Sequence, residues 1–191
     1  MKPGRGFSLV ELIVGMAILG VLLAIAMPAF SNWLRNARVR TAAESVQNGL
    51  QLARAEAVRR NTTIRFQLVD TTDDSCALST AGPNWVVSFD SPVGACATPP
   101  SDTVAPRIIQ LRSGAEGSAD TTLTAGRSDL VFNSFGRNTT GNVVIDVASA
   151  TGELCLVSGG PIRCLRIMVT LGGQIRMCDP ALAVGDAQAC T

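Results

Sequence analysis

Hydrophobic residues are concentrated in one long run near the start of the chain. Residues 12–27 carry no charge, and only Ser8 and Glu11 interrupt the apolar run over residues 7–26. About 20 residues of helix cross the hydrocarbon layer of a bilayer. The pattern therefore predicts a membrane-spanning half of a helix over residues 7–27.

A helical period continues beyond this run, but on one face only. Pro28 removes a backbone donor and is expected to kink or loosen the helix locally. Apolar residues then recur at steps of 4, 3, 4, 3 and 4, at Val39, Ala43, Val46, Leu50, Ala53 and Ala57. This spacing is typical of an amphipathic helix. Residues 28–60 are therefore predicted to form the amphipathic half of the same helix, which stops near Asn61.

Residues 61–191 contain short alternating segments separated by clusters of Gly, Asn, Ser and Pro, which is typical of strands and turns. The predicted strands are 63–70, 85–90, 107–111, 130–133, 143–148, 154–157, 165–171 and 174–177. The absence of a strand–helix–strand alternation argues against a parallel doubly wound sheet. The expected fold is α+β, with a long N-terminal helix packed on an antiparallel two-sheet β domain.

Composition narrows the possible functions. Of 191 residues, 47% are hydrophobic and 16% are charged, and the formal net charge is +1. This balance excludes a polybasic nucleic-acid-binding chain and an acidic disordered tail. Histidine is absent, which excludes a Ser-His-Asp triad, a Cys-His dyad and a His-based zinc site.

The flanks of the apolar run predict its orientation. Lys2 and Arg5 precede the run and no acidic residue does, so the positive-inside rule leaves the N-terminus in the cytoplasm and the globular domain in the periplasm. A signal peptide cleaved after residues 24–26, a plain anchor and a prepilin leader all have such a run. Glu11 favours the third, because a carboxylate in a membrane helix costs roughly 2.5–3.5 kcal/mol at the centre and benefits neither of the others. A Glu that reaches the headgroups is the plainer alternative.

Residues 4–11, Gly-Arg-Gly-Phe-Ser-Leu-Val-Glu, resemble the prepilin processing motif of type IV pilins and type II secretion pseudopilins. The resemblance implies a leader of residues 1–6, cleavage by a prepilin peptidase between Gly6 and Phe7, and N-methylation of Phe7. It also implies that Glu11 is the fifth mature residue, and that Pro28 marks a stretch of helix that can melt in the filament.

Cleavage would give Glu11 a physical role in assembly. An unpaired ammonium at Phe7 and an unpaired carboxylate at Glu11 are each costly in an apolar environment, and a pair removes most of both costs. Pairing with the amine of a neighbouring subunit also fixes the axial step of an assembly. We therefore expect Glu11 to recruit the subunit into a filament with other pilins.

Further segments resemble the H-type minor pilins (the FimU/FimT group) and the GspH pseudopilins. These segments are residues 41–45, 52–57, 84–87, 131–137 and 167–176. The resemblance covers nearly the whole chain, apart from the loops at 76–96 and 114–120. It implies the GspH-like two-sheet fold.

All six cysteines follow the membrane segment, and none forms a C-x-x-C pair. The oxidising periplasm favours disulfides, whereas the lack of histidine and of close thiol pairs argues against a metal. Local spacing favours first-neighbour pairs: Cys155–Cys164 across a hairpin at 159–160, Cys178–Cys190 in a C-terminal loop, and Cys76–Cys96 around the strand at 85–90. A bond between Cys178 and an upstream cysteine is the alternative.

No arrangement of residues indicates catalysis or a cofactor. Asp70, Asp73 and Asp74 lack the spacing of an EF-hand and suggest a solvated polar loop. The glycine pairs at 159–160 and 172–173 are not followed by the Lys-Ser/Thr of a phosphate loop and read as turns. The expected protein is therefore not an enzyme.

The favoured function is a minor pilin in the filament, or in its priming or tip complex, of a type IV pilus. A GspH-type pseudopilin of type II secretion is one alternative. DNA binding is the other, since FimT-type members carry a C-terminal Gly-Arg-x-Arg. Residues 173–176 read Gly-Gln-Ile-Arg, so half of that motif is missing. Arg163, Arg166 and Arg176 remain candidates for phosphate contacts.

Overall fold

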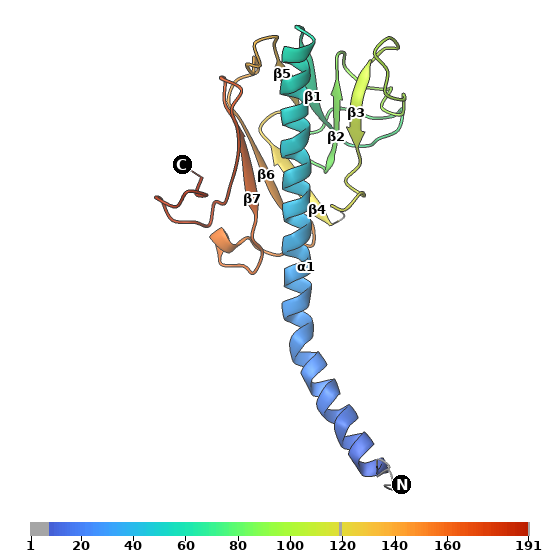
Figure 1. Ribbon diagram of the computed structural model, residues 1–191, viewed down its shortest axis with the longest axis vertical. Helices are drawn as coiled ribbons and strands as arrows, with labels where there is room; N and C mark the ends of the chain where they lie inside the picture. The colour runs from blue at the N-terminus through green and yellow to red at the C-terminus, as the bar shows by residue number, and fades with distance from the viewer. Residues whose placement is uncertain (1–7, 119, 191) are drawn as a thin grey trace, which may run out of the picture. The chain divides into compact units, whose positions relative to one another are not determined.

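The computed structural model describes residues 8–118 and 120–190, and the chain divides into two compact units, Met1–Leu34 and Arg35–Thr191. One helix, α1 (Leu9–Arg59), passes through both units, and the described strands belong to the second (Figure 1). The helix continues through Pro28, so this proline does not end it. A kink at Pro28 stays a prediction.

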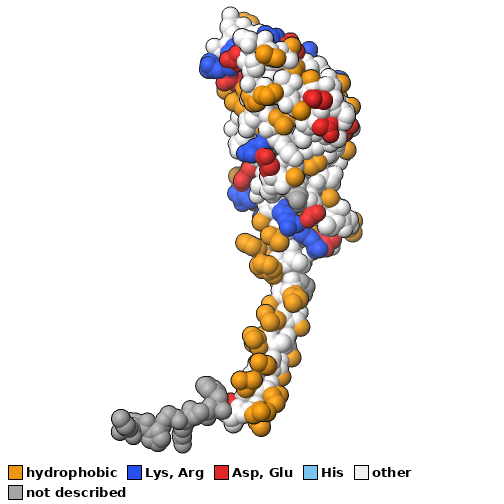
Figure 2. Space-filling view, turned by 90° about the vertical axis from the view of Figure 1, so that its right-hand side faces the viewer, with side chains coloured by type: hydrophobic (Ala, Val, Ile, Leu, Met, Phe, Trp, Pro, Cys, Tyr) orange, Lys and Arg blue, Asp and Glu red, His pale blue; other side chains and the backbone are white. Residues whose placement is uncertain are grey.

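In the first unit, α1 exposes its apolar side chains on all sides, and they cover the surface of this part of the helix in Figure 2. The exposed residues are Leu9, Val10, Leu12, Ile13, Val14, Met16, Ile18, Leu19, Val21, Leu22, Leu23, Ile25 and Met27. Among the described helices, α1 is long and apolar enough to cross a membrane. A helix that is apolar all round requires lipid or other protein around it.

The second unit contains two four-stranded sheets in which all paired strands are antiparallel. The first has the order β3-β2-β1-β5, from β1 (Ile64–Val69), β2 (Asn84–Ser88), β3 (Ile108–Arg112) and β5 (Asp129–Phe132). The second has the order β4-β6-β7-β8, from β4 (Thr121–Ala125), β6 (Val143–Ser149), β7 (Leu165–Val169) and β8 (Ile175–Cys178). The α+β fold expected from the sequence is confirmed.

One hydrophobic core joins the second half of α1 to both sheets. Every member of the predicted apolar face is buried in it, namely Val39, Ala43, Val46, Leu50, Ala53 and Ala57. They pack with Phe66 and Leu130 of the first sheet and with Ile145 and Ile167 of the second. Burial of this stripe, at roughly 25 cal/mol per Å² of apolar surface, holds the helix on the sheets.

Gly49 is the point of closest approach between α1 and the first sheet. A Cβ at this position would lie 2.8 Å from the ring of Trp85 and 2.9 Å from the ring of Phe66. The two rings also contact each other, with centroids 5.5 Å apart. The missing side chain of Gly49 therefore makes the space into which both rings pack.

A second, smaller core covers the other face of the first sheet. It consists of Val69, Val86, Ile108 and the disulfide-bonded Cys76 and Cys96. The disulfide thus fastens the loops at 70–83 and 89–107 to this face of the sheet, although many of their other side chains are exposed. The first sheet is consequently buried on both faces, which explains why Gln67 is buried although it alternates with core residues.

Two sequence predictions of secondary structure are wrong. The sequence did not predict strand β4, because Thr-Thr-Leu-Thr-Ala has only one large apolar residue. In the structure this segment is ordered by pairing with β6. Residues 154–157 were expected to be a strand, but they lead into the 3-10 helix η1 (Leu156–Ser158). The short loop closed by Cys155 and Cys164 is not a β-hairpin, and its bridge between Cys155 and Ile162 is parallel.

Candidate assembly helix and functional residues

The start of α1 is defined by a polar cap just before the apolar residues. The backbone N–H of Glu11 donates to Ser8 Oγ at 3.3 Å, and the backbone N–H of Leu12 donates to the carbonyl of Ser8 at 3.2 Å. Ser-x-x-Glu is the capping-box pattern, which satisfies backbone donors at a helix N-terminus. This cap was not predicted from the sequence, although the spacing of Ser8 and Glu11 is a usable signal.

Glu11 lies in the first turn of α1 and its side chain is exposed. Within residues 8–118 and 120–190, no cation forms an ion pair with it. The proposed cleavage residues Gly6 and Phe7 lie outside the described residues.

The structure contains three disulfides, and they join the pairs expected from the sequence. Their Cα–Cα separations are 6.1 Å for Cys76–Cys96, 5.4 Å for Cys155–Cys164 and 5.1 Å for Cys178–Cys190. The alternative bond from Cys178 to an upstream cysteine is not formed. All three bonds lie in the second unit, where each closes a loop on the surface of a sheet.

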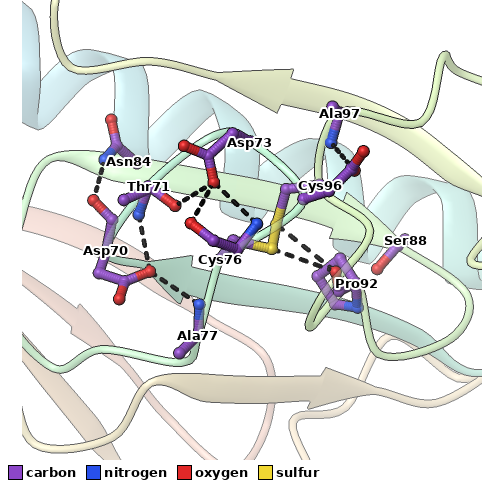
Figure 3. Close-up of a disulfide and its surroundings, with 12 residues drawn as sticks. Asp70, Thr71, Asp73, Cys76, Ala77, Asn84, Ser88, Pro92, Cys96 and Ala97 are labelled. Atoms are coloured by element: carbon purple, nitrogen blue, oxygen red, sulfur yellow. Dashed lines mark hydrogen bonds between the residues drawn. A yellow bond between two sulfur atoms is a disulfide. The ribbon is translucent and has the colours of Figure 1, made fainter.

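The acidic residues near Cys76 stabilise their own loop (Figure 3). The backbone N–H of Ala77 donates to Asp70 Oδ1 at 2.7 Å, and the hydroxyl and backbone N–H of Ser75 donate to Asp73. These bonds lower the pKa of both carboxyls, because they favour the charged form. Asp74 accepts a backbone N–H from the far side of the disulfide. Among the described residues, no group of acids is placed to hold a metal ion.

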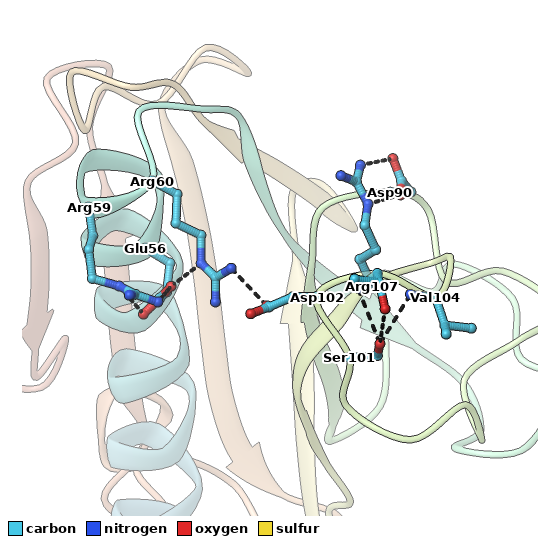
Figure 4. A network of polar contacts seen from close by, with 9 residues as sticks. Glu56, Arg59, Arg60, Asp90, Ser101, Asp102, Val104 and Arg107 are labelled. Carbon is cyan, nitrogen blue, oxygen red and sulfur yellow. Dashed lines mark hydrogen bonds and ion pairs between the residues drawn. The ribbon is translucent and has the colours of Figure 1, made fainter.

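A polar network secures the end of α1 to the loops above the first sheet (Figure 4). Arg60 bridges Glu56, at 2.6 Å, and Asp102, at 2.7 Å. The guanidinium groups of Arg60 and Arg107 lie over the ring of Phe89, 5.1 and 4.5 Å from its centroid. The spacing of Glu56 and Arg60 is a local signal for that pair, but no local pattern indicates the rest of the network, because its other members come from separate segments.

The three arginines considered for DNA contact are engaged within the chain. Arg163 pairs with Asp179, and Arg166 Nε donates to Asp146 Oδ1 at 2.7 Å. The guanidinium of Arg176 donates to two backbone carbonyls of the C-terminal loop, at 3.1 and 2.8 Å. The register of β7 and β8 places Arg166 and Arg176 on one face of the second sheet. Arg163 and Arg176 thus bind the C-terminal loop, whereas Arg166 binds the neighbouring strand β6.

Comparison with known families identifies the fold and the N-terminal segment. The model described as "Type II transport protein GspH" matches residues 42–173. The chain belongs to the GspH family. The model described as "Prokaryotic N-terminal methylation motif" matches residues 1–27 of this GspH-family chain. The resemblance to type IV pilins, and to H-type minor pilins in particular, is confirmed.

Solved structures of the type IV minor pilin FimU from Pseudomonas aeruginosa share the fold of this GspH-family chain. One has a TM-score of 0.53 at 18% identity and aligns 78% of this chain with 93% of its own. A second crystal form has a TM-score of 0.51 at 17% identity, covering 77% and 98%. The likeness is one of architecture, a helix packed on an antiparallel two-sheet domain.

Curated relatives are fimbrial proteins. The Fimbrial protein of Moraxella nonliquefaciens is 43% identical over 42 residues, 22% of this chain and 27% of the relative. Fimbrial protein Q of Moraxella bovis is 28% identical over 82 residues, 43% of this chain and 52% of the relative. The GspH-family chain thus matches between about a quarter and half of the length of these relatives. The chain is thus a GspH-family member with an N-terminal methylation motif, and its N-terminal apolar helix is suited to membrane anchoring.

Proposed function

We propose that this chain is a minor pilin that joins a type IV pilus, or its priming or tip complex, through α1. The observation that carries the proposal is the apolar half of α1, exposed on all sides, with Glu11 in its first turn and no ion pair to Glu11 from the described cations. Such a surface is stable in lipid before assembly and among other pilin helices afterwards. The globular unit then faces the periplasm, anchored in the inner membrane.

Processing provides the partner for Glu11. A prepilin peptidase cuts between Gly6 and Phe7, and the new amine is N-methylated. The carboxylate of Glu11 pairs with this amine on a neighbouring subunit and sets the axial step between subunits. Residues 1–6 are the leader, residues 7–27 the transmembrane half, residues 28–60 the amphipathic half and residues 61–191 the periplasmic domain.

Incorporation into filaments tests the role of Glu11. Glu11→Ala should be processed and remain in the membrane fraction, but should be lost from the sheared pilus fraction. Glu44→Ala is a matched control, because it removes an exposed carboxylate from the same helix that forms only a surface pair with Arg40. Unchanged incorporation of Glu11→Ala into the pilus fraction refutes the proposal. So does a purified protein that begins at Met27 or retains its first six residues in cells with an active prepilin peptidase.

A GspH-type pseudopilin of type II secretion is the second candidate, favoured by the family whose model matches residues 42–173. The two candidates share the same anchor and fold and differ in the machine that they join. Complementation of a deletion strain separates them. Restored twitching motility with unchanged protein secretion supports the pilus, and the reverse result supports the secretion system.

DNA binding is not favoured. Arg163, Arg166 and Arg176 are held by acidic side chains or carbonyls. Removal of residues 1–6 takes away Lys2 and Arg5, which leaves 14 basic against 15 acidic side chains. A salt-sensitive gel shift that Arg176→Ala weakens would instead support DNA binding. No described feature suggests an enzyme or a cofactor, and the proposed role is structural.

A further inference from the structure

A disulfide-closed loop in the second unit exposes three large apolar side chains within four positions. Leu154 is 61% exposed, Leu156 is 47% exposed and Val157 is 59% exposed. Single apolar residues on a surface are ordinary, whereas a contiguous group on one loop marks an interaction site. The pilin fold by itself does not require this group, because none of these side chains belongs to the buried core.

The loop is held in place by a covalent bond and by hydrogen bonds. The exposure of these side chains therefore does not result from disorder of the loop. The bond between Cys155 and Cys164 closes it, and the buried Ile162 anchors it in the main core. The backbone N–H of Leu156 donates to the carbonyl of Ile162 at 2.7 Å, and that of Gly160 donates to Cys155 at 3.0 Å. A preformed apolar surface loses little conformational entropy on binding.

The loop packs against the beginning of the second unit. The backbone N–H of Arg163 donates to Asn36 Oδ1 at 2.7 Å, and Glu153 pairs with Arg35. Trp33 precedes Arg35 by two residues in the sequence. It stacks on Phe30 with a centroid distance of 5.9 Å, and both rings are exposed. Exposed aromatic rings at the end of a membrane helix mark the headgroup level of a bilayer.

The cations beside the loop are already neutralised. Arg35 pairs with Glu153, and the next cation along the loop, Arg163, pairs with an aspartate of the C-terminal loop. The surface is therefore apolar with a rim of paired charges. Such a surface fits the boundary between headgroups and acyl chains, where apolar side chains are buried and paired charges stay hydrated.

We infer that residues 154–157 insert into the periplasmic face of the membrane while the subunit is anchored there before assembly. This inference rests on the membrane anchoring in the proposed function. Insertion would give the globular unit a second attachment beside α1 and restrict its motion. Because apolar burial drives it, insertion depends little on salt or on anionic lipid.

Quenching by brominated lipid tests the inference on the full chain, reconstituted at one copy per vesicle so that no neighbouring subunit covers the loop. The vesicles contain phosphatidylcholine with bromine on its acyl chains. Val157→Trp is made in a Trp33→Phe background, with Leu154→Trp as a second reporter. Val184→Trp is the matched control, because Val184 is a 91% exposed apolar residue at the C-terminal loop. Trp85 is buried in the parent chain, away from the substituted positions, and is expected to give a constant background.

The expected result is a loss of emission for Val157→Trp similar to that of the native Trp33, unchanged in high salt, with no loss for Val184→Trp. Quenching of native Trp33 without quenching at positions 154 and 157 overturns this inference and leaves the anchoring intact. Absence of quenching at Trp33 refutes the anchoring and the inference together. Quenching that disappears in high salt also overturns the inference, since salt-sensitive quenching indicates electrostatic attraction to the membrane and not apolar insertion.

Discussion

The Gly49→Ala substitution tests whether the backbone of α1 directly contacts two aromatic rings of the first sheet. The added Cβ would lie 2.8 Å from Trp85 and 2.9 Å from Phe66, closer than real Cβ atoms approach their neighbours. Neither ring can move aside easily. Phe66 is fully buried, and the indole N–H of Trp85 donates to Ser45 Oγ at 3.2 Å.

Two opposing effects determine the size of the change. Alanine is favoured over glycine in a helix interior by about 1 kcal/mol. Overpacking of a filled core costs typically about 1–3 kcal/mol. Because the Cβ of residue 49 would meet two fixed rings, we expect the upper part of this range. The free energy of unfolding of Gly49→Ala should then fall by about 1–2 kcal/mol.

Urea unfolding of the full chain in mild detergent measures this change. Fluorescence of Trp85 reports on the second unit when Trp33 is replaced by Phe. The exposed Gln51 in the same helix provides the control, since Gln51→Ala and Gln51→Gly differ only in helix propensity. If Gly49→Ala is more stable than the parent by the difference measured at position 51, the close contact does not limit packing and the reasoning is refuted.

Three further predictions concern the second unit. Cys76→Ala with Cys96→Ala opens a bond of sequence separation 20 and should lower the free energy of unfolding by about 3 kcal/mol in urea titrations; an unchanged midpoint would contradict this. Gly173→Ala should lower the free energy of unfolding by at least about 2 kcal/mol, because φ at this residue is +80° and a Cβ would lie 1.9 Å from a backbone oxygen. Gly172→Ala should leave the free energy of unfolding nearly unchanged in the same titration. Neighbouring arginines, Arg59 first, lower the pKa of Glu56, so the stability that the charged Glu56 contributes is present at neutral pH and is lost as the pH falls below the usual range of a Glu. The difference in thermal midpoint between the parent and Glu56→Gln should therefore shrink on acidification, and a constant difference would refute this prediction.

The helix and its two halves could be predicted from the sequence because both depend on local periodicity. A continuous apolar run indicates lipid exposure, and the 4, 3, 4, 3, 4 spacing from Val39 to Ala57 indicates one buried face. Disulfide pairing was also accessible, because short separations restrict which cysteines meet. The processing motif at residues 4–11 was recognisable because its residue types are specified one by one.

Strand β4 and the loop at 154–158 required the tertiary structure. The three threonines of β4 favour a strand, but its one large apolar residue gives no clear buried face in the sequence, and its order is seen only in its pairing with β6. Residues 154–157 have the pattern of a strand but lack a neighbouring strand to pair with, apart from one bridge at Cys155. Their exposed apolar side chains cannot be told from core residues by sequence alone.

The candidate site divides in the same way. Sequence alone determined which segment we propose as the anchor and assembly element, because an acidic residue beside an otherwise apolar helix start is visible in the linear order of residues. Only the tertiary structure decided that Arg163, Arg166 and Arg176 bind partners within the chain. It also decided that the disulfide-closed loop beside Asn36 exposes apolar side chains. Pairing between segments far apart in the chain depends on how the sheets and helix pack, and no local pattern encodes it.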